Sequence, residues 1–223
     1  MIKNSVLLPL FLILSLICTQ SINYNINLIH NITFENSSNN FGVSDVWGYT
    51  DETDIEYAIV GYMNGTSIIN VSEDEPFEVA NIIGPSNGDY YFHRDYKTYN
   101  HHLYIVNEMY GGDVGMQIID LSPLPDNPPI QLETYNGIAQ SHNLWIDSSG
   151  YAYIEHQTGD NIHILNLSNP SSPIYESSFS NQALNCHDIY TKNNMAYVSE
   201  GWSNQFGIYD ITNLDEIILL ATI

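Results

Sequence analysis

The chain has 223 residues, of which 26 are Asp or Glu and only 4 are Lys or Arg, so its formal net charge is −22. This excess of negative charge repels phosphate backbones and excludes nucleic acid as a partner. With two cysteines the chain also cannot be a small fold held together by several disulfides, and its length is enough for one sizeable hydrophobic core.

Residues 1–21 have the pattern of a secretory signal peptide. Lys3 provides the positive start, and Val6–Ile17 form an apolar run that is too short to span a bilayer. A lipoprotein acylated on Cys18 is the alternative, but an apolar residue precedes this cysteine where a small one is usual. Removal of the leader leaves Cys186 as the last cysteine, so we expect a secreted or cell-surface protein without an intramolecular disulfide and without a transmembrane segment.

Residues 22–42 form an N-terminal segment ahead of the main repeats. Within it Asn25–Phe34 alternate between polar and apolar residues, which predicts a strand that could close a ring of sheets. The repeats that follow supply all the strands of their own units, so this strand lacks a partner. We therefore expect the sequence to be a fragment that forms an open arc with exposed strand edges and poor solubility.

A unit of about fifty residues occurs four times in residues 43–223. One anchor is a pair of apolar residues, then Asp or Asn, an apolar residue, and Ser or Thr; the Asp or Asn positions are 50, 46 and 44 residues apart. The second anchor is a tyrosine that lies 13, 16, 13 and 13 residues earlier. The two anchors fall at Asn70, Asp120, Asn166 and Asp210, and at Tyr57, Tyr104, Tyr153 and Tyr197.

Each unit contains four short apolar or alternating runs separated by Gly, Pro, Asn and Ser, which is typical of a four-stranded antiparallel sheet. Side chains of Asp or Asn followed by Ser or Thr can bond nearby backbone N–H groups, which would start the turn after the third strand. The sequence predicts an all-β, propeller-like array of four four-stranded antiparallel blades, in an incomplete ring. The blades are expected over residues 43–83, 90–136, 141–180 and 185–223.

Histidine is a third recurrent residue, because His93, His142 and His187 each precede a second-strand tyrosine by ten or eleven residues. Trp47 holds this place in the first unit. If the units are blades, these residues lie on the innermost strands and converge on the axis, where three imidazoles can bind zinc or another transition metal. The alternative is a structural role in which each ring bonds a neighbouring blade. Arg94 and Asp188, next to two of the histidines, complete the expected ligand-binding set.

Other candidate sites have weaker support. Two acid clusters in turns, Asp51–Glu56 and Glu73–Glu75, make calcium an alternative metal, but neither has a calcium-loop pattern and both suit solvated loops. The segment Gly84–Gly88 matches the Gly-x-Ser-x-Gly elbow of hydrolases, yet no helical pattern follows it. Cys186 is expected to be a small buried residue rather than a nucleophile.

Several segments together resemble the choice-of-anchor B proteins, whose units are called LVIVD repeats. They are Asp45–Tyr49, Glu56–Gly61, Gly115–Leu121, Ser141–Asn143 and His187–Asp188, and the resemblance extends over about residues 24–223. It implies a secreted or surface-attached propeller, and it implies no catalytic activity. The chain departs from the family pattern at His93, where a tryptophan is more usual, and at Ile223, after which neither further units nor an anchor follow.

These observations favour a non-catalytic extracellular binding module for a protein, a glycan or a small ligand, because propeller loops commonly carry binding functions. The alternative from another class is a secreted metal-dependent hydrolase or lactonase that uses His93, His142 and His187. The two hypotheses differ in whether the purified protein holds a stoichiometric transition metal.

Overall fold

The structure, a computed structural model, describes residues 27–34, 42–85, 93–109, 114–155, 162–180 and 186–223. The chain divides into two compact units, residues 1–31 and residues 32–223. The signal-peptide pattern lies outside the described residues. The part of the first unit that is described, residues 27–31, has no regular secondary structure, and the sheets all belong to the second unit.

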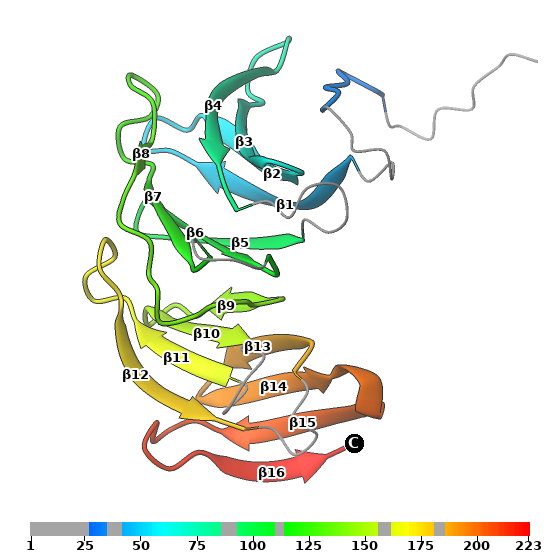
Figure 1. The fold of residues 1–223 in the computed structure, drawn as a ribbon, viewed down its shortest axis with the longest axis vertical. Helices are drawn as coiled ribbons and strands as arrows, with labels where there is room; N and C mark the ends of the chain where they lie inside the picture. The colour runs from blue at the N-terminus through cyan, green and yellow to red at the C-terminus, as the bar shows by residue number, and fades with distance from the viewer. Residues whose placement is uncertain (1–26, 35–41, 86–92, 110–113, 156–161, 181–185) are drawn as a thin grey trace, which may run out of the picture. The chain divides into compact units, whose positions relative to one another are not determined.

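The second unit consists of four antiparallel sheets, each of four strands in sequence order (Figure 1). The first two sheets are β1 (Val43–Thr50), β2 (Glu56–Tyr62), β3 (Gly65–Asn70) and β4 (Phe77–Ile83), then β5 (Arg94–Tyr99), β6 (His102–Asn107), β7 (Gln117–Asp120) and β8 (Ile130–Gln131). The other two are β9 (Leu144–Ile146), β10 (Tyr151–Glu155), β11 (Ile162–Asn166) and β12 (Ile174–Phe179), then β13 (Asp188–Lys192), β14 (Met195–Glu200), β15 (Gln205–Asp210) and β16 (Ile218–Thr222). The predicted fold class is therefore confirmed. One 3₁₀ turn, η1 (Gly201–Ser203), is the sole helical element in the described ranges.

The Asp or Asn anchor occupies the same place in all four sheets, whereas the tyrosine anchor does so in three. Tyr104, Tyr153 and Tyr197 pair with the residue two before the Asp or Asn, but Tyr57 pairs with Asn70 itself. The anchor tyrosines lie on the second strands β2, β6, β10 and β14, as predicted. The Asp or Asn that ends each third strand accepts a hydrogen bond from the backbone N–H two residues later, at 2.8–2.9 Å, in all four units. The expected local role of these side chains in starting the turn to the fourth strand is thus present four times.

The hydrophobic core consists of three clusters, one between each pair of consecutive sheets. The second and third strands supply most of it, and in the middle sheets alternate residues of one strand belong to the clusters on opposite faces. Ile59 and Ile105 belong to the first cluster, Ile154 to the second and Ile164 to the third, and all four are fully buried. Burial of each such side chain stabilises the fold by about 1.5–3 kcal/mol.

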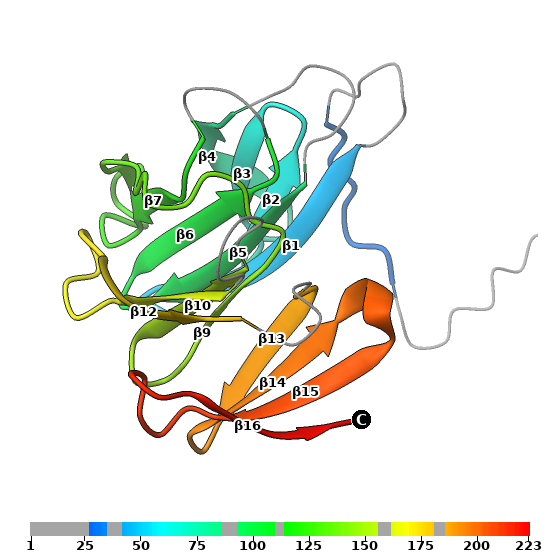
Figure 2. The same ribbon diagram turned by 60° about the horizontal axis from the view of Figure 1, so that its bottom comes forward.

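Consecutive sheets also contact one another through their first strands, because β1 lies beside β5, β5 beside β9 and β9 beside β13 (Figure 2). The indole N–H of Trp47 on β1 donates to the hydroxyl of Thr98 on β5 at 3.0 Å. The indole N–H of Trp145 on β9 makes the same 3.0 Å bond to Thr191 on β13. The repeat therefore preserves polar contacts between sheets as well as the apolar core.

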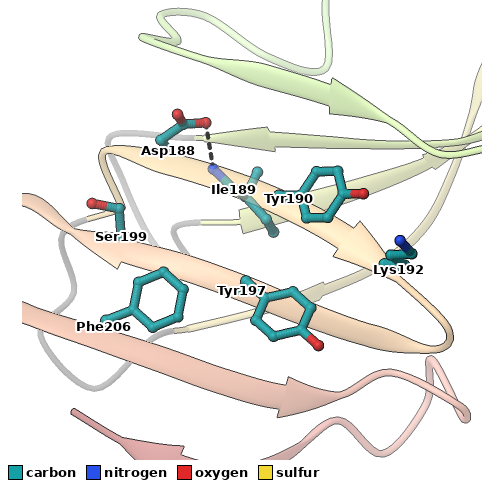
Figure 3. A pocket seen from close by; sticks show the side chains of 7 residues that line it. All are labelled: Asp188, Ile189, Tyr190, Lys192, Tyr197, Ser199 and Phe206. Atoms are coloured by element: carbon teal, nitrogen blue, oxygen red, sulfur yellow. Dashed lines mark hydrogen bonds between the residues drawn. The ribbon is translucent and has the colours of Figure 1, made fainter.

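The last sheet has an aromatic outer face. Tyr190, Tyr197 and Phe206 come from three adjacent strands, with 6.3 Å between the centroids of each successive pair of rings (Figure 3). Tyr190 is 44% exposed. Among the described strands, none of the last sheet approaches a strand of the first sheet as closely as consecutive sheets approach each other. This arrangement agrees with the predicted incomplete ring.

The strand predicted over Asn25–Phe34 is absent from the described part of that segment, because residues 27–34 have no strand. Phe34 instead packs its ring on Tyr62, with centroids 5.5 Å apart and planes inclined by 21°. The alternation of residues favoured a strand, but a strand also needs backbone hydrogen bonds to a sheet edge. None of the four sheets includes residues 27–34 as a fifth strand.

Candidate functional site

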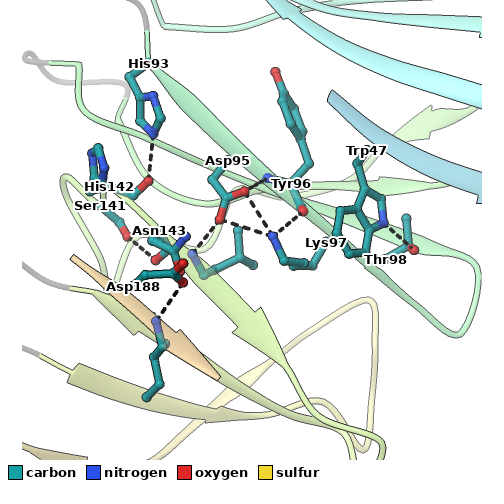
Figure 4. Close-up of polar contacts among 12 residues, drawn as sticks. Trp47, His93, Asp95, Tyr96, Lys97, Thr98, Ser141, His142, Asn143 and Asp188 are labelled. Carbon is teal, nitrogen blue, oxygen red and sulfur yellow. Dashed lines mark hydrogen bonds and ion pairs between the residues drawn. The ribbon is translucent and has the colours of Figure 1, made fainter. Parts of the chain in front are cut away.

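A pocket of about 330 Å³ lies where the first strands of the four sheets come together (Figure 4). We call it the axial pocket. Trp47, Lys97 and Asn143 are part of its lining. The lining also includes three histidines and three aspartates, namely His93, His142 and His187, and Asp45, Asp95 and Asp188.

The three histidines lie side by side at one end of this pocket. The rings of His93 and His142 stack with centroids 4.3 Å apart, and those of His142 and His187 are 4.9 Å apart. The rings are in the loops just before β5, β9 and β13 and not on those strands, contrary to the prediction. The sequence spacing therefore predicted correctly that the three histidines come together. It did not predict that they lie in loops and not on strands.

The strand registers correct the expected equivalence of these residues. In the strand pairs that contain the anchor tyrosines, the first-strand partners are Tyr49, Lys97, Trp145 and Tyr190. His142 and His187 each precede their partner by three residues, whereas His93 precedes Lys97 by four. Trp47 corresponds to Trp145 and not to a histidine, because both tryptophans make the same bond to the next sheet. Only two of the four positions are thus structurally equivalent.

Glu108 joins this group and was missed in the sequence. It follows β6 directly, and its backbone N–H donates to the carbonyl of His93 at 3.3 Å, which holds the two residues side by side. Its Oε1 lies 3.1 Å from Nδ1 of His142. The hydrogen bond with Glu108 raises the pKa of His142 above its usual value, although burial of the ring opposes this. A glutamate at the end of the second strand recurs as Glu155 and Glu200, and this pattern was the available signal.

A second polar cluster holds the middle of the pocket (Figure 4). Asp95 accepts hydrogen bonds from Lys97 Nζ at 3.0 Å and, across the sheet boundary, from the backbone N–H of Leu144 at 2.8 Å. Lys97 also lies 4.5 Å above the Trp47 ring. Burial and the adjacent carboxyl of Asp95 raise the pKa of Asp45. Three aspartates and one paired lysine make the pocket acidic.

The structure places Arg94 outside the axial pocket, which corrects its assignment to the ligand-binding set. Its side chain is fully buried between the first two sheets. The guanidinium donates to the carbonyl of Tyr62 at 2.8 Å and to that of Pro85. Arg94 points away from His93 because adjacent residues of an extended chain point to opposite sides. Its role is to join two sheets.

Asp188 lines the pocket as expected. Its carboxylate accepts from the backbone N–H of the next residue, Ile189, at 2.7 Å. Trp47 also lines the pocket as expected. The sequence-predicted residues that the structure brings together are thus Trp47, the three histidines and Asp188.

Cys186 is 3% exposed, and burial raises the pKa of its thiol. A neutral, buried thiol is a poor nucleophile. In a Cys18→Ser variant we expect Cys186 to react with a disulfide reagent such as DTNB at least about 100 times more slowly in the native state than in urea, because reaction needs exposure and ionisation. Fast stoichiometric labelling of the native protein would contradict its structural role.

In the described ranges, no helix has the length and apolar character needed to cross a membrane.

No family model matches the sequence, and no curated protein matches it. Two solved structures show the same fold. A functionally unknown protein from Desulfotomaculum acetoxidans superposes with a TM-score of 0.61 at 15% identity, over 82% of this chain and 56% of that one. A protein from Lactobacillus plantarum gives a TM-score of 0.62 at 10% identity, over 82% of this chain and 58% of the other. The chain thus spans less than two thirds of the length of these structures.

Proposed function

We propose that this protein is a secreted or cell-surface binding module that holds a small ligand in the axial pocket. The observation that carries the proposal is that all four sheets contribute side chains to one pocket of about 330 Å³. This volume is within the roughly 300–1,000 Å³ of small-molecule sites. The signal-peptide pattern of residues 1–21 supports an extracellular location.

We also propose that the protein belongs among the choice-of-anchor B proteins with LVIVD repeats. The support is the order and spacing of the quoted segments, together with a repeat whose four units each fold into one sheet. The bond from Trp47 to Thr98 of the neighbouring sheet gives the first of these segments a structural reason.

The lining of the pocket defines the chemistry of the ligand. Asp45, Asp95 and Asp188 offer acceptors, and Lys97, the one lysine of the lining, already donates to Asp95. Oδ1 of Asn143 is a buried acceptor that has no hydrogen-bond partner among the described residues. An acceptor left unmatched in this way costs about 1–3 kcal/mol, so a ligand that donates to it is favoured. The ligand should therefore carry several hydroxyl or amine donors, as a sugar unit does.

Saturation-transfer NMR with a panel of neutral monosaccharides and small primary amines tests this proposal. We expect at least one of these probes to bind, and Asp188→Ala to weaken its binding by at least about tenfold, which is the loss of one charge-assisted hydrogen bond. The exposed Asp126, in the loop between β7 and β8, provides the matched control Asp126→Ala. Equal binding by both variants, or no binding by any probe, would contradict a ligand site in the axial pocket.

A secreted metal-dependent hydrolase or lactonase is a second candidate function. The specific observation that favours it is the group of His93, Glu108 and His142, since catalytic zinc sites commonly have three protein ligands and one open position. Hydrolysis of lactone or ester probes that depends on zinc and is lost in Glu108→Gln would support the enzyme over the binding module.

A further inference from the structure

We propose that His93, Glu108 and His142 form a binding site for a divalent transition metal, and that zinc suits this site best. The inference goes beyond the proposed ligand binding, because a metal at these three residues needs no organic ligand in the pocket. It also changes the metal set expected from the sequence, in which His187 stood in the place that Glu108 takes.

The positions of the three side chains suit one metal ion. One ligand atom from each of His93, Glu108 and His142 can be chosen so that all lie within 4.8 Å of one another. Two atoms that bind one tetrahedral zinc at about 2.0–2.1 Å lie about 3.4 Å apart. Glu108 Oε1 and His142 Nδ1, at 3.1 Å, are already at this spacing. The third atom, from His93, must come closer than this 4.8 Å limit, so metal binding requires a rotation of the His93 side chain.

The hydrogen bond of His93 fixes which of its nitrogens can bind the metal. Nε2 lies 2.9 Å from the backbone carbonyl of His142. A carbonyl only accepts, so Nε2 must carry the proton and Nδ1 carries the lone pair. Metal-bound histidines typically donate their other N–H to a carbonyl or carboxylate in this way. The lone pair lies in the plane of the ring, so His93 must turn out of its stack with His142 when the metal binds.

The donor set selects the class of metal. Two imidazoles and one carboxylate suit zinc and other borderline transition metals. Calcium requires six to eight oxygens, which this group cannot supply, so the structure favours zinc over calcium. Three protein ligands leave a coordination position for water or a ligand, and His93 and His142 also line the axial pocket. The net charge of −22 further favours association with cations.

The site joins two sheets. His93 and Glu108 belong to the second sheet, at the start of β5 and the end of β6, whereas His142 precedes β9 of the third sheet. A metal bound to all three would connect these sheets at the axis. Because the ion binds the folded state, zinc should raise the melting temperature, and by more as the free zinc concentration increases.

Calorimetric titration of the metal-depleted protein with Zn²⁺ tests the proposal, with Co²⁺ as a spectroscopic probe. We expect one equivalent of zinc, and absorption bands of a four- or five-coordinate site for cobalt. His142→Ala and the nearly isosteric Glu108→Gln should each weaken zinc binding by at least about 100-fold, the upper end of the cost of losing an outer-shell partner. His102→Ala is the matched control, because this histidine lies in the β5–β6 hairpin and bonds Ser171 at 2.9 Å.

Circular dichroism of each variant shows whether its fold is retained, and Glu108→Gln keeps the experiment informative if His142→Ala does not fold. The proposal is overturned if zinc does not bind, if Glu108→Gln binds it as the unchanged protein does, or if the site takes Ca²⁺ in preference to Zn²⁺. Loss of zinc binding in Glu108→Gln with retained binding of the monosaccharide or amine probe supports two separable sites. If the protein binds the monosaccharide or amine probe but never binds zinc, the result contradicts the metal site and does not contradict the ligand site in the axial pocket.

Discussion

Replacing Arg94 by alanine is expected to lower the free energy of unfolding by roughly 3–5 kcal/mol, as truncation of other large core side chains does. Arg94 is fully buried, and its guanidinium bonds the carbonyls of Tyr62 and Pro85. Alanine leaves both a cavity and two carbonyls that have lost a donor. Urea unfolding at pH 7 measures the change.

Two further variants divide this effect into its causes. Arg94→Met keeps most of the buried volume and removes the donors, so the difference between it and Arg94→Ala reports the cavity. Lys192→Ala is the control for loss of one positive charge, because Lys192 is exposed at the end of β13. A change below about 1 kcal/mol in Arg94→Ala, the level usual for surface positions, would show that Arg94 does not join the sheets as described.

Replacing Asp51 by asparagine is expected to destabilise the protein by about 2–4 kcal/mol at pH 7, because hydrogen bonds to a charged acceptor contribute more than neutral ones. Oδ1 of Asp51 accepts from Thr53 N and Thr53 Oγ1 at 2.8 Å and from Ile55 N at 3.1 Å. Oδ2 accepts from the hydroxyl of Tyr57 at 3.0 Å. An asparagine amide can replace one oxygen of the carboxylate but not both.

The effect should depend on pH with a defined sign. Burial acts to raise the pKa of Asp51, but the hydrogen bonds from Thr53, Ile55 and Tyr57 outweigh it and lower the pKa below 3.8. A depressed pKa contributes stability that is present above pH 3.8 and is lost as the pH falls through the folded-state value. Asp51→Asn should therefore approach the unchanged protein in stability below pH 3.8. Asp74→Asn, at an exposed loop position, is the control, and an equal gap at all pH values would contradict the prediction.

The repeat in the sequence predicted the fold because the features that define each unit are local. The Asp or Asn at the end of each third strand bonds a backbone N–H two residues later, so its role depends on nothing outside the unit. The second-strand tyrosines lie 13 residues before these residues in three units and 16 before in the second unit. Antiparallel strands joined by short turns pair with their sequence neighbours, and the four sheets follow directly from this rule.

The candidate site could be predicted only in part because its geometry depends on contacts between units. The equal spacing of His93 with the other histidines does not reveal its shift of one residue in register. Glu108 reaches His142 across a sheet boundary, at a separation of 34 positions in the chain, which no local pattern encodes. Arg94, next to His93 in sequence, faces the opposite side and bonds carbonyls of the first sheet. The proximity of Arg94 and His93 in sequence therefore suggested a shared function, but the extended backbone directs their side chains to opposite sides.

The aromatic outer face of the last sheet has a consequence for how the protein unfolds. In an array of similar units, stability is approximately the sum of what each unit contributes and what each interface between neighbours contributes. The sheets β5–β8 and β9–β12 each share two hydrophobic clusters with their neighbours, whereas β1–β4 and β13–β16 each share one. These two outer sheets thus have less coupling energy than the middle two, and β13–β16 can open in a separate, earlier step than they do. Unfolding of this chain is better described as a sequence that begins at an outer sheet than as a single all-or-none event.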